Sequence, residues 1–136
     1  MKLIGIDYGM RRIGLAATDE SGEFIRSLPT IDRKTSNQFL EDLCGIIASE
    51  NASQIVIGLP LNDDGVDTPM SLEIRAFAAR LSQKIAVPIK FVDESLTSVR
   101  ANDIIRYRKK KQRREKGNVD KIAACLILEE FKREQA

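Results

Sequence analysis

Three acidic positions in this chain stand at the boundaries of apolar segments. Asp7 follows a short apolar run near the N-terminus. The pair Asp93-Glu94 follows a second run, and Asp120 begins a third. A carboxylate at the end of a buried strand is costly to desolvate unless it binds a cation or a hydrogen-bond donor. Because the sequence contains no histidine, we expect chemistry here to rest on carboxylates, hydroxyls and basic side chains around a hard divalent metal.

Converging carboxylates favour a particular class of cofactor. Carboxylates in a low-dielectric pocket repel one another, so they need raised pKa values, a basic partner or a divalent metal. Ligand sets made only of oxygen suit Mg²⁺ or Mn²⁺ rather than zinc. Two such ions about 4 Å apart can activate a water and stabilise the leaving oxygen during phosphodiester hydrolysis. The acidic positions therefore indicate metal-dependent hydrolysis that needs no histidine.

Each acid also has an ordinary structural explanation. Asp7 could begin an Asx-type turn before Gly9. Asp93 or Glu94 could cap a following helix, and Asp120 is favourable in a first helical turn because of the helix dipole. One such acid alone is weak evidence for a site, whereas three at element boundaries of one small chain are more specific.

Basic residues are concentrated in one segment. Residues 106–116 hold eight basic residues and one acid, a net charge of +7, on a chain whose net charge is +2, so the remainder sums to −5. Such a segment indicates a polyanionic partner, although a solvated loop would have the same composition. We expect nucleic-acid contacts from Arg11 and Arg12 beside Asp7, and from six residues of the segment: Arg108, Lys109, Lys110, Lys111, Arg113 and Arg114.

The apolar patterns predict an α/β fold in the order βββ-α-β-α-β-α-α. The predicted elements are strands at 2–7, 13–18 and 23–31, a helix at 36–50, a strand at 54–59, a helix from Pro69, a strand at 89–92 and helices at about 95–105 and 119–133. Short connections favour a meander of the first three strands, and the other two strands are reached through helices. We therefore expect a mixed five-stranded sheet, a three-strand meander plus two parallel strands, with helices on both faces.

This fold would bring the acids together. Ligands bind near the carboxyl ends of parallel strands, where Asp7 and the pair Asp93-Glu94 are expected. Ala123 and Ala124 share the helical face of Asp120, and their small side chains would let the last helix approach the sheet.

Composition bounds the class of protein. With 136 residues, 43% hydrophobic and 31% charged, the chain is expected to be a single domain covering residues 1–136. The sequence shows no apolar stretch of membrane-spanning length and no signal-peptide pattern, so we expect a cytoplasmic protein with no membrane partner. Cys44 and Cys125 lie in apolar helical patterns and are expected to be buried free thiols.

Four motifs in order resemble the YqgF (RuvX) family. They are residues 7–16, residues 57–62 with Asp64-Gly65, residues 93–98 and residues 119–124, and together they cover nearly the whole chain. The resemblance implies an RNase H-like fold and a metal-dependent nuclease that matures the 5′ end of pre-16S ribosomal RNA. It also implies Asp7, Glu94 and Asp120 as the catalytic and metal-binding residues. Ser95 departs from the arginine that is common in the family, which removes a cation beside Glu94.

Several alternatives stay open from the sequence. The family resemblance also suggests a Holliday junction resolvase acting on branched DNA, which would need two active sites. A non-catalytic RNA-binding assembly factor is a second alternative. The sequence distinguishes neither RNA from branched DNA nor a monomer from a dimer, and it fixes neither the cleavage position nor the choice between Mg²⁺ and Mn²⁺.

Overall fold

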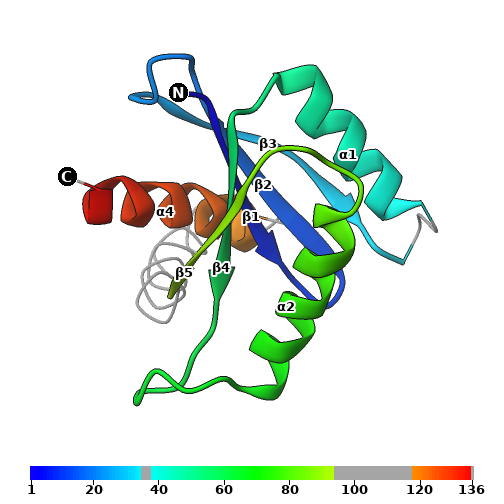
Figure 1. Cartoon of the computed structure of the whole chain (residues 1–136), viewed down its shortest axis with the longest axis vertical. Coiled ribbons are helices and arrows are strands. Elements are labelled where there is room, and N and C mark those ends of the chain that lie inside the picture. The colour runs from blue at the N-terminus through cyan, green and yellow to red at the C-terminus, as the bar shows by residue number, and fades with distance from the viewer. Residues whose placement is uncertain (35–37, 94–117, 136) are drawn as a thin grey trace, which may run out of the picture.

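The computed structural model describes residues 1–34, 38–93 and 118–135, with only the backbone described for residues 118–121. Its elements, labelled as in Figure 1, are β1 (Leu3–Tyr8), β2 (Arg12–Thr18), β3 (Ile25–Asp32), α1 (Phe39–Glu50), β4 (Gln54–Leu59), α2 (Pro69–Ser82), β5 (Ile89–Asp93) and α4 (Asn118–Gln135). The strands predicted from sequence all form, and their ends differ by one or two residues. The predicted helix at 95–105 and the basic segment at 106–116 lie outside the described residues.

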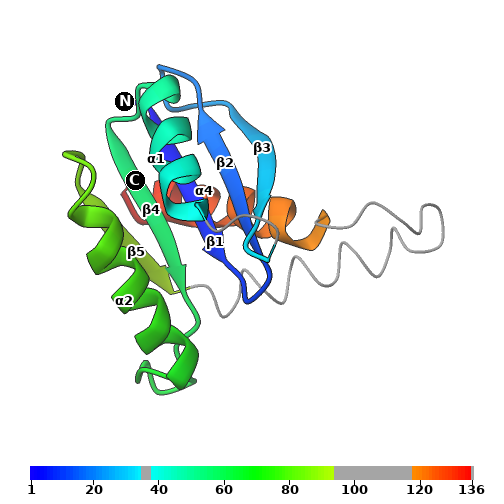
Figure 2. The ribbon, with the colours of Figure 1, turned by 90° about the vertical axis from the view of Figure 1, so that its right-hand side faces the viewer.

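The five strands form one mixed sheet in the order β3-β2-β1-β4-β5. β1 pairs antiparallel with β2, and β2 pairs antiparallel with β3, as the predicted meander requires. β4 is parallel to β1, and β5 is parallel to β4. Helices α1 and α2 cover one face of the sheet and α4 crosses the other (Figures 1 and 2), so the predicted sheet with helices on both faces is confirmed.

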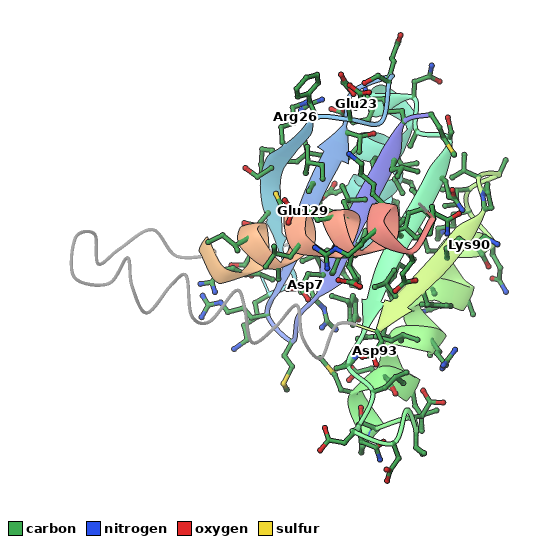
Figure 3. All side chains as sticks on the ribbon, turned by 90° about the vertical axis from the view of Figure 1, so that its left-hand side faces the viewer. Asp7, Glu23, Arg26, Lys90, Asp93 and Glu129 are labelled. Carbon is green, nitrogen blue, oxygen red and sulfur yellow. The ribbon has the colours of Figure 1, made fainter. Side chains whose placement is uncertain are left out.

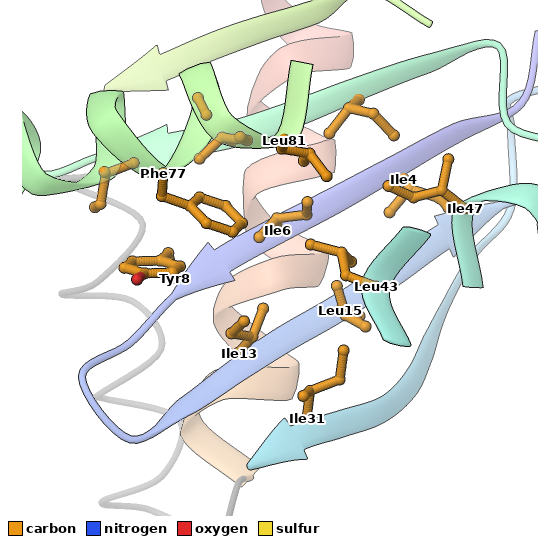
Figure 4. Close-up of a cluster of buried hydrophobic side chains, with 14 of the residues drawn as sticks. Ile4, Ile6, Tyr8, Ile13, Leu15, Ile31, Leu43, Ile47, Phe77 and Leu81 are labelled. Carbon is orange, nitrogen blue, oxygen red and sulfur yellow. The ribbon is translucent and has the colours of Figure 1, made fainter. Parts of the chain in front are cut away.

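Alternation along β1 assigns its side chains to two different cores. Ile4, Ile6 and Tyr8 belong to the cluster packed under α1 and α2 (Figure 4). Leu3 instead packs with the buried residues of α4. Because side chains alternate between the faces of a strand, Gly5 and Asp7 share the α4 face with Leu3. β4, an interior strand between β1 and β5, is buried along its whole length, as expected for a parallel strand covered on both faces.

Close packing between α4 and β1 depends on Gly5. A methyl group at this position would lie 2.7 Å from Leu128 Cγ and 2.9 Å from the carbonyl oxygen of Ala124. Ala123 and Ala124 are both buried, which confirms that the small residues of this helix let it approach the sheet. Gly5 is the small residue of β1 that faces these alanines, and no sequence pattern indicated its role.

The start of α2 is closed by its own side chains. Thr68 is the N-cap, its hydroxyl accepts a hydrogen bond from Ser71 N, and the Ser71 hydroxyl accepts one from Thr68 N. Pro69 occupies the first turn, where a missing N–H costs nothing. The predicted start of this helix at Pro69 is therefore confirmed. α1 begins later than predicted, at Phe39, with Gln38 at the N-cap position.

The two cysteines are free thiols, as predicted, but each is half-buried rather than fully buried. Desolvation raises the pKa of both thiols, and Glu129 adds to the effect at Cys125. Both thiols are therefore weak nucleophiles at neutral pH. Within the described residues, no helix has the length and apolar character needed to cross a membrane.

Candidate active site at the end of β1

Asp7 lies next to the last residue of β1, on the face of the sheet that α4 covers. It pairs in register with Gly14 of β2 and is half-buried. Asp7 is two residues beyond Gly5, where α4 contacts the sheet, so the two residues are neighbours on the same face of β1. Figure 3 shows Asp7 beside α4, toward the end of the sheet where β1 and β4 finish.

Asp120 enters the same region through α4. It is the third residue of this helix, one helical turn before Ala124, whose carbonyl oxygen lies against Gly5. The backbone positions of Asp7 and Asp120 therefore both lie within a few residues of a single helix–strand contact. The side chain of Asp120 belongs to the part of α4 for which only the backbone is described.

Asp93 is the last residue of β5, at the same end of the sheet as Asp7, and it pairs in register with Leu59. It nevertheless faces the opposite side from Asp7. Val92 packs in the α4 cluster, whereas Phe91 lies under the guanidinium of Arg75 from α2, 5.4 Å from carbon to ring centroid. Alternation therefore places Asp93 on the α2 face. Glu94, the residue expected from the family motif, lies outside the described residues.

Within the described side chains, no three acids, cysteines or histidines gather closely enough to hold a metal ion. Two of the three predicted ligands, Glu94 and Asp120, have side chains outside that set. The ligand set Asp7, Glu94 and Asp120 therefore stays a prediction. The donor chemistry fits a hard cation, since all three groups are carboxylates.

The two arginines beside Asp7 occupy the turn between β1 and β2. Arg11 is exposed, and its Nε lies 3.8 Å from a carboxylate oxygen of Asp32. Arg12 begins β2, is half-buried and pairs in register with Asp32. The predicted contacts from Arg108, Lys109, Lys110, Lys111, Arg113 and Arg114 lie outside the described residues.

Arg33 holds this turn in place, and no sequence motif marked it. Its Nη1 donates to the carbonyl oxygens of Gly9 at 2.7 Å and Met10 at 3.1 Å. Its backbone N–H donates to the Arg11 carbonyl at 2.7 Å, and its guanidinium carbon lies 4.4 Å from the centroid of the Tyr8 ring. The turn that follows Asp7 is therefore tied to the end of β3 by both the backbone and the side chain of one residue.

A separate hollow lies on the other face of the sheet. It has a volume of about 390 Å³ and lies between α1 and the connection from α2 to β5. Its lining residues are Cys44, Ile47, Ala48, Asn51, Ala52, Lys84, Ile85, Ala86 and Val87. None of the predicted site residues whose side chains the structure describes lines this hollow, so we treat it as separate from the candidate site.

The strand order, the strand directions and the helix crossing β1 define an RNase H-like fold of the RuvC class. The structure of Thermus thermophilus RuvC superposes with a TM-score of 0.61 at 12% identity, covering 99% of this chain and 97% of that one. The Fowlpox virus resolvase bound to Holliday junction DNA gives a TM-score of 0.58 at 13% identity, covering 99% and 97%. At these identities the likeness establishes the fold.

The sequence comparison is more specific. The family model RuvX, described as "Holliday junction resolvase", matches residues 1–133, and this chain belongs to that family. A relative from Maridesulfovibrio salexigens is 40% identical over 95% of this chain and 96% of its own length. A relative from Crocosphaera subtropica is 37% identical over 94% and 90%. Both relatives carry the name "Putative pre-16S rRNA nuclease".

Proposed function

We propose that this protein is a divalent-metal-dependent nuclease that hydrolyses phosphodiester bonds and matures the 5′ end of pre-16S ribosomal RNA in the cytoplasm. The observation that supports the proposal is the close packing of Ala124 against Gly5, because Asp7 lies two residues beyond Gly5 in β1 and Asp120 lies one helical turn before Ala124 in α4. Membership of the RuvX family and the names of the relatives support the nuclease class and the RNA substrate.

We assign the metal ligands as Asp7, Glu94 and Asp120, for Mg²⁺ or Mn²⁺. Asp7 faces α4 from the end of β1, and Asp120 belongs to the first turn of that helix. Asp93 faces α2, away from Asp7, so we take the third ligand, Glu94, from the family motif. When bound, divalent cations supply activation of a water and charge neutralisation at the leaving oxygen.

Binding of the scissile phosphate is assigned to side chains around the turn between β1 and β2. Arg11 is exposed and only loosely paired with Asp32 at 3.8 Å, so it is available to contact phosphate oxygens. Arg12 follows it at the start of β2. These arginines would orient the scissile phosphate, and the basic segment at 106–116 would add affinity without reading sequence.

The substitution Asp7→Asn tests the catalytic assignment. It removes a charged ligand without changing side-chain size, so we expect cleavage of a pre-16S ribosomal RNA precursor to fall by at least about a hundredfold, since metal and charge stabilisation contribute several kcal/mol. RNA affinity and thermal stability should stay near those of the unchanged protein. The control is Glu73→Gln, an exposed acid of α2, which should keep full activity.

Two outcomes would contradict this assignment. Full activity of pure Asp7→Asn would remove Asp7 from the catalytic machinery. Undiminished cleavage in excess EDTA would exclude metal dependence. RNA binding without turnover at every Mg²⁺ and Mn²⁺ concentration would favour a non-catalytic assembly factor instead.

A Holliday junction resolvase is the second candidate function, favoured by the description of the family model. Resolution of a junction needs two active sites, whereas maturation of an RNA end needs one. Incubating the purified protein with the RNA precursor and with a four-way DNA junction, each with and without Mn²⁺, separates the candidates. Symmetrical cuts in the junction by a dimeric protein, with no RNA cleavage, would favour the resolvase.

A further inference from the structure

Four basic residues surround the turn between β1 and β2. Arg11 and Arg12 belong to the turn and the start of β2, and Arg33 and Lys34 follow the end of β3. We call these four residues the cationic surface. Backbone hydrogen bonds hold its two parts together, since Arg33 N donates to the Arg11 carbonyl at 2.7 Å.

The charge of this surface is only partly compensated. Asp32 is the acid between its two parts, and it lies 3.8 Å from Arg11 Nε while accepting a hydrogen bond from Lys34 N at 2.8 Å. The Arg11–Asp32 pair is long and exposed, so it contributes little and leaves the arginine able to contact another anion. Four cations beside Asp32 give this turn, in the described part of the chain, a positive potential.

The shape of the cationic surface is set by Arg33. Its guanidinium lies between the rings of Tyr8 and Phe39, at 4.4 Å and 5.4 Å from their centroids. Nη1 bridges two carbonyls of the turn, and Nε is buried with no hydrogen-bond partner in the described part of the chain. The cations are therefore displayed on a preorganised turn rather than on a loosely held loop, which reduces the entropy lost on binding.

The other flank of Asp7 has the opposite charge. The loop at residues 60–68 follows β4 and contains three acids, Asp63, Asp64 and Asp67, and no basic residue. Arg75 and Ser71 donate hydrogen bonds that lower the pKa of Asp67. Because Arg75 also forms an ion pair with Asp67 at 2.9 Å, the negative charge of this loop comes mainly from Asp63 and Asp64. Asp63 and Asp64 are exposed.

This acidic loop also has a fixed shape. Asn62 Oδ1 accepts hydrogen bonds from the backbone N–H groups of Asp64 and Val66, both at 2.9 Å. The Thr68 hydroxyl donates to the Pro60 carbonyl at 2.9 Å. The loop therefore presents its acids in a defined arrangement.

Sheet order places Asp7 between these two surfaces. β1 lies between β2 and β4, so the cationic surface is on the β2–β3 side of Asp7 and the acidic loop is on the β4 side. A polyanion passing over Asp7 would be attracted along one side and repelled along the other. Figure 2 shows that the turn between β1 and β2 and the loop after β4 lie at the same end of the sheet. They are separated along the order of the strands.

We propose that, among the residues that the structure describes, those that hold the nucleic-acid backbone lie on one side of the bond to be cut, along the cationic surface, and that the loop at residues 60–68 keeps the backbone off the opposite side. The inference rests on the proposed nuclease function. It adds Lys34 to the binding surface and Arg33 as the residue that positions this surface. It also specifies the substrate as a strand that is contacted by these residues on one flank of the scissile phosphate.

Charge-reversal variants test the proposal through binding alone. A fluorescently labelled single-stranded RNA oligonucleotide is titrated in EDTA at several salt concentrations, so the readout does not depend on cleavage. Lys34→Glu should weaken binding about fivefold and lower the salt slope by about one. Its matched control is Lys90→Glu, the same change at an exposed site of β5, two strands from Asp7 (Figure 3), which should change affinity less than twofold.

The acidic flank is tested by the reverse change. Asp64→Lys should tighten RNA binding severalfold, because a repulsive charge becomes attractive. The control is Glu23→Lys, at an exposed turn on the opposite end of the sheet (Figure 3). It changes the net charge of the protein by the same amount but should have a smaller effect on RNA binding. Arg33→Met, which keeps an unbranched apolar stem, should weaken binding more than Lys90→Glu does.

The outcomes separate this inference from the proposed function. Equal weakening by Lys34→Glu and Lys90→Glu would overturn the one-sided surface, as would equal effects of Asp64→Lys and Glu23→Lys. Neither result would affect the nuclease assignment, which depends on Asp7→Asn. Binding that follows the prediction, together with full cleavage by Asp7→Asn, would support the surface and contradict the catalytic site.

Discussion

At the scale of single residues, Gly5 determines how closely α4 approaches β1. The space beside it is filled by Leu128 and by the backbone of Ala124, so a side chain at position 5 must displace a helix backbone and not merely a flexible group. The same contact positions the part of α4 that carries Asp120 relative to the strand that carries Asp7. A residue with no functional group of its own would therefore control the geometry of the proposed acidic site.

Substituting Gly5 tests this role. Gly5→Ala should lower the free energy of unfolding by about 1–3 kcal/mol, the usual cost of overpacking a core. Gly45→Ala is the matched control, because Gly45 is exposed within α1 and a methyl group there meets nothing within 4 Å. That control should raise the free energy of unfolding by about 0.5–1 kcal/mol because alanine is the better helix former.

Urea denaturation measures both variants. Metal-dependent cleavage should fall in Gly5→Ala, even at temperatures where the variant is fully folded, and should be unchanged in Gly45→Ala. The same sign of stability change in both variants would show that Gly5 does not limit the packing of α4.

At the scale of elements, the segment from β4 to α2 combines a rigid loop with a capped helix. The Thr68 hydroxyl serves both parts, since it donates to the Pro60 carbonyl and accepts from Ser71 N. Asp67 extends the arrangement through hydrogen bonds from the Ser71 hydroxyl at 2.7 Å and Arg75 Nε at 2.9 Å. One hydroxyl group thus links the loop after β4 to the helix that covers the face of the sheet opposite Asp7.

Removal of that hydroxyl should destabilise the protein. Thr68→Ala is expected to lower the free energy of unfolding by about 1 kcal/mol, the typical cost of losing an N-cap. Thr68→Ser keeps the hydroxyl and should lose only a few tenths of a kcal/mol, in line with the preference of serine for N-caps. Chemical denaturation of the two variants provides the comparison, and an equal loss in both would argue against the cap.

At the scale of the whole molecule, charge is divided between a basic segment and a mildly acidic remainder. Residues 106–116 carry a net charge of +7 on a chain of net charge +2. This division favours association with a polyanion at the segment while the rest of the surface limits nonspecific contact. Affinity for nucleic acid should therefore depend strongly on salt.

Neutralising part of the segment tests this division. The triple variant Lys109→Gln, Lys110→Gln and Lys111→Gln should weaken binding to RNA of any sequence and flatten its salt dependence, by about one unit of slope for each lost phosphate contact. Lys84→Gln combined with Lys90→Gln, at exposed sites outside the segment, provides the control. A changed sequence preference with an unchanged slope would contradict a backbone-binding role.

The sequence predicted the fold because its local signals agree with the final packing. The run at 54–59 predicted a strand, and a helix was predicted from Pro69; both are confirmed. Gly5 was missed because its role depends on Leu128, more than a hundred residues away in the chain. Arg33 was missed for the same reason, since its partners Tyr8, Gly9 and Met10 come from another strand and its turn.

The candidate site was only partly predictable from spacing. A period of two places Asp93 on the α2 face, yet the sequence alone does not say which face of the last strand meets the final helix. Asp7 and Asp120 were placed by element boundaries, and the structure describes the side chain of the first and the backbone of the second. The assignment of Glu94 rests on the family motif and stays a prediction.

The contact between β1 and α4 has a consequence for the order of folding. Gly5 meets Leu128, and these two residues are more than a hundred positions apart in the chain. Closing so long a loop costs conformational entropy before the contact can stabilise anything, and contacts of this kind slow folding. The face of β1 that carries Asp7 therefore stays uncovered during synthesis until α4, which follows all five strands in the chain, has been made.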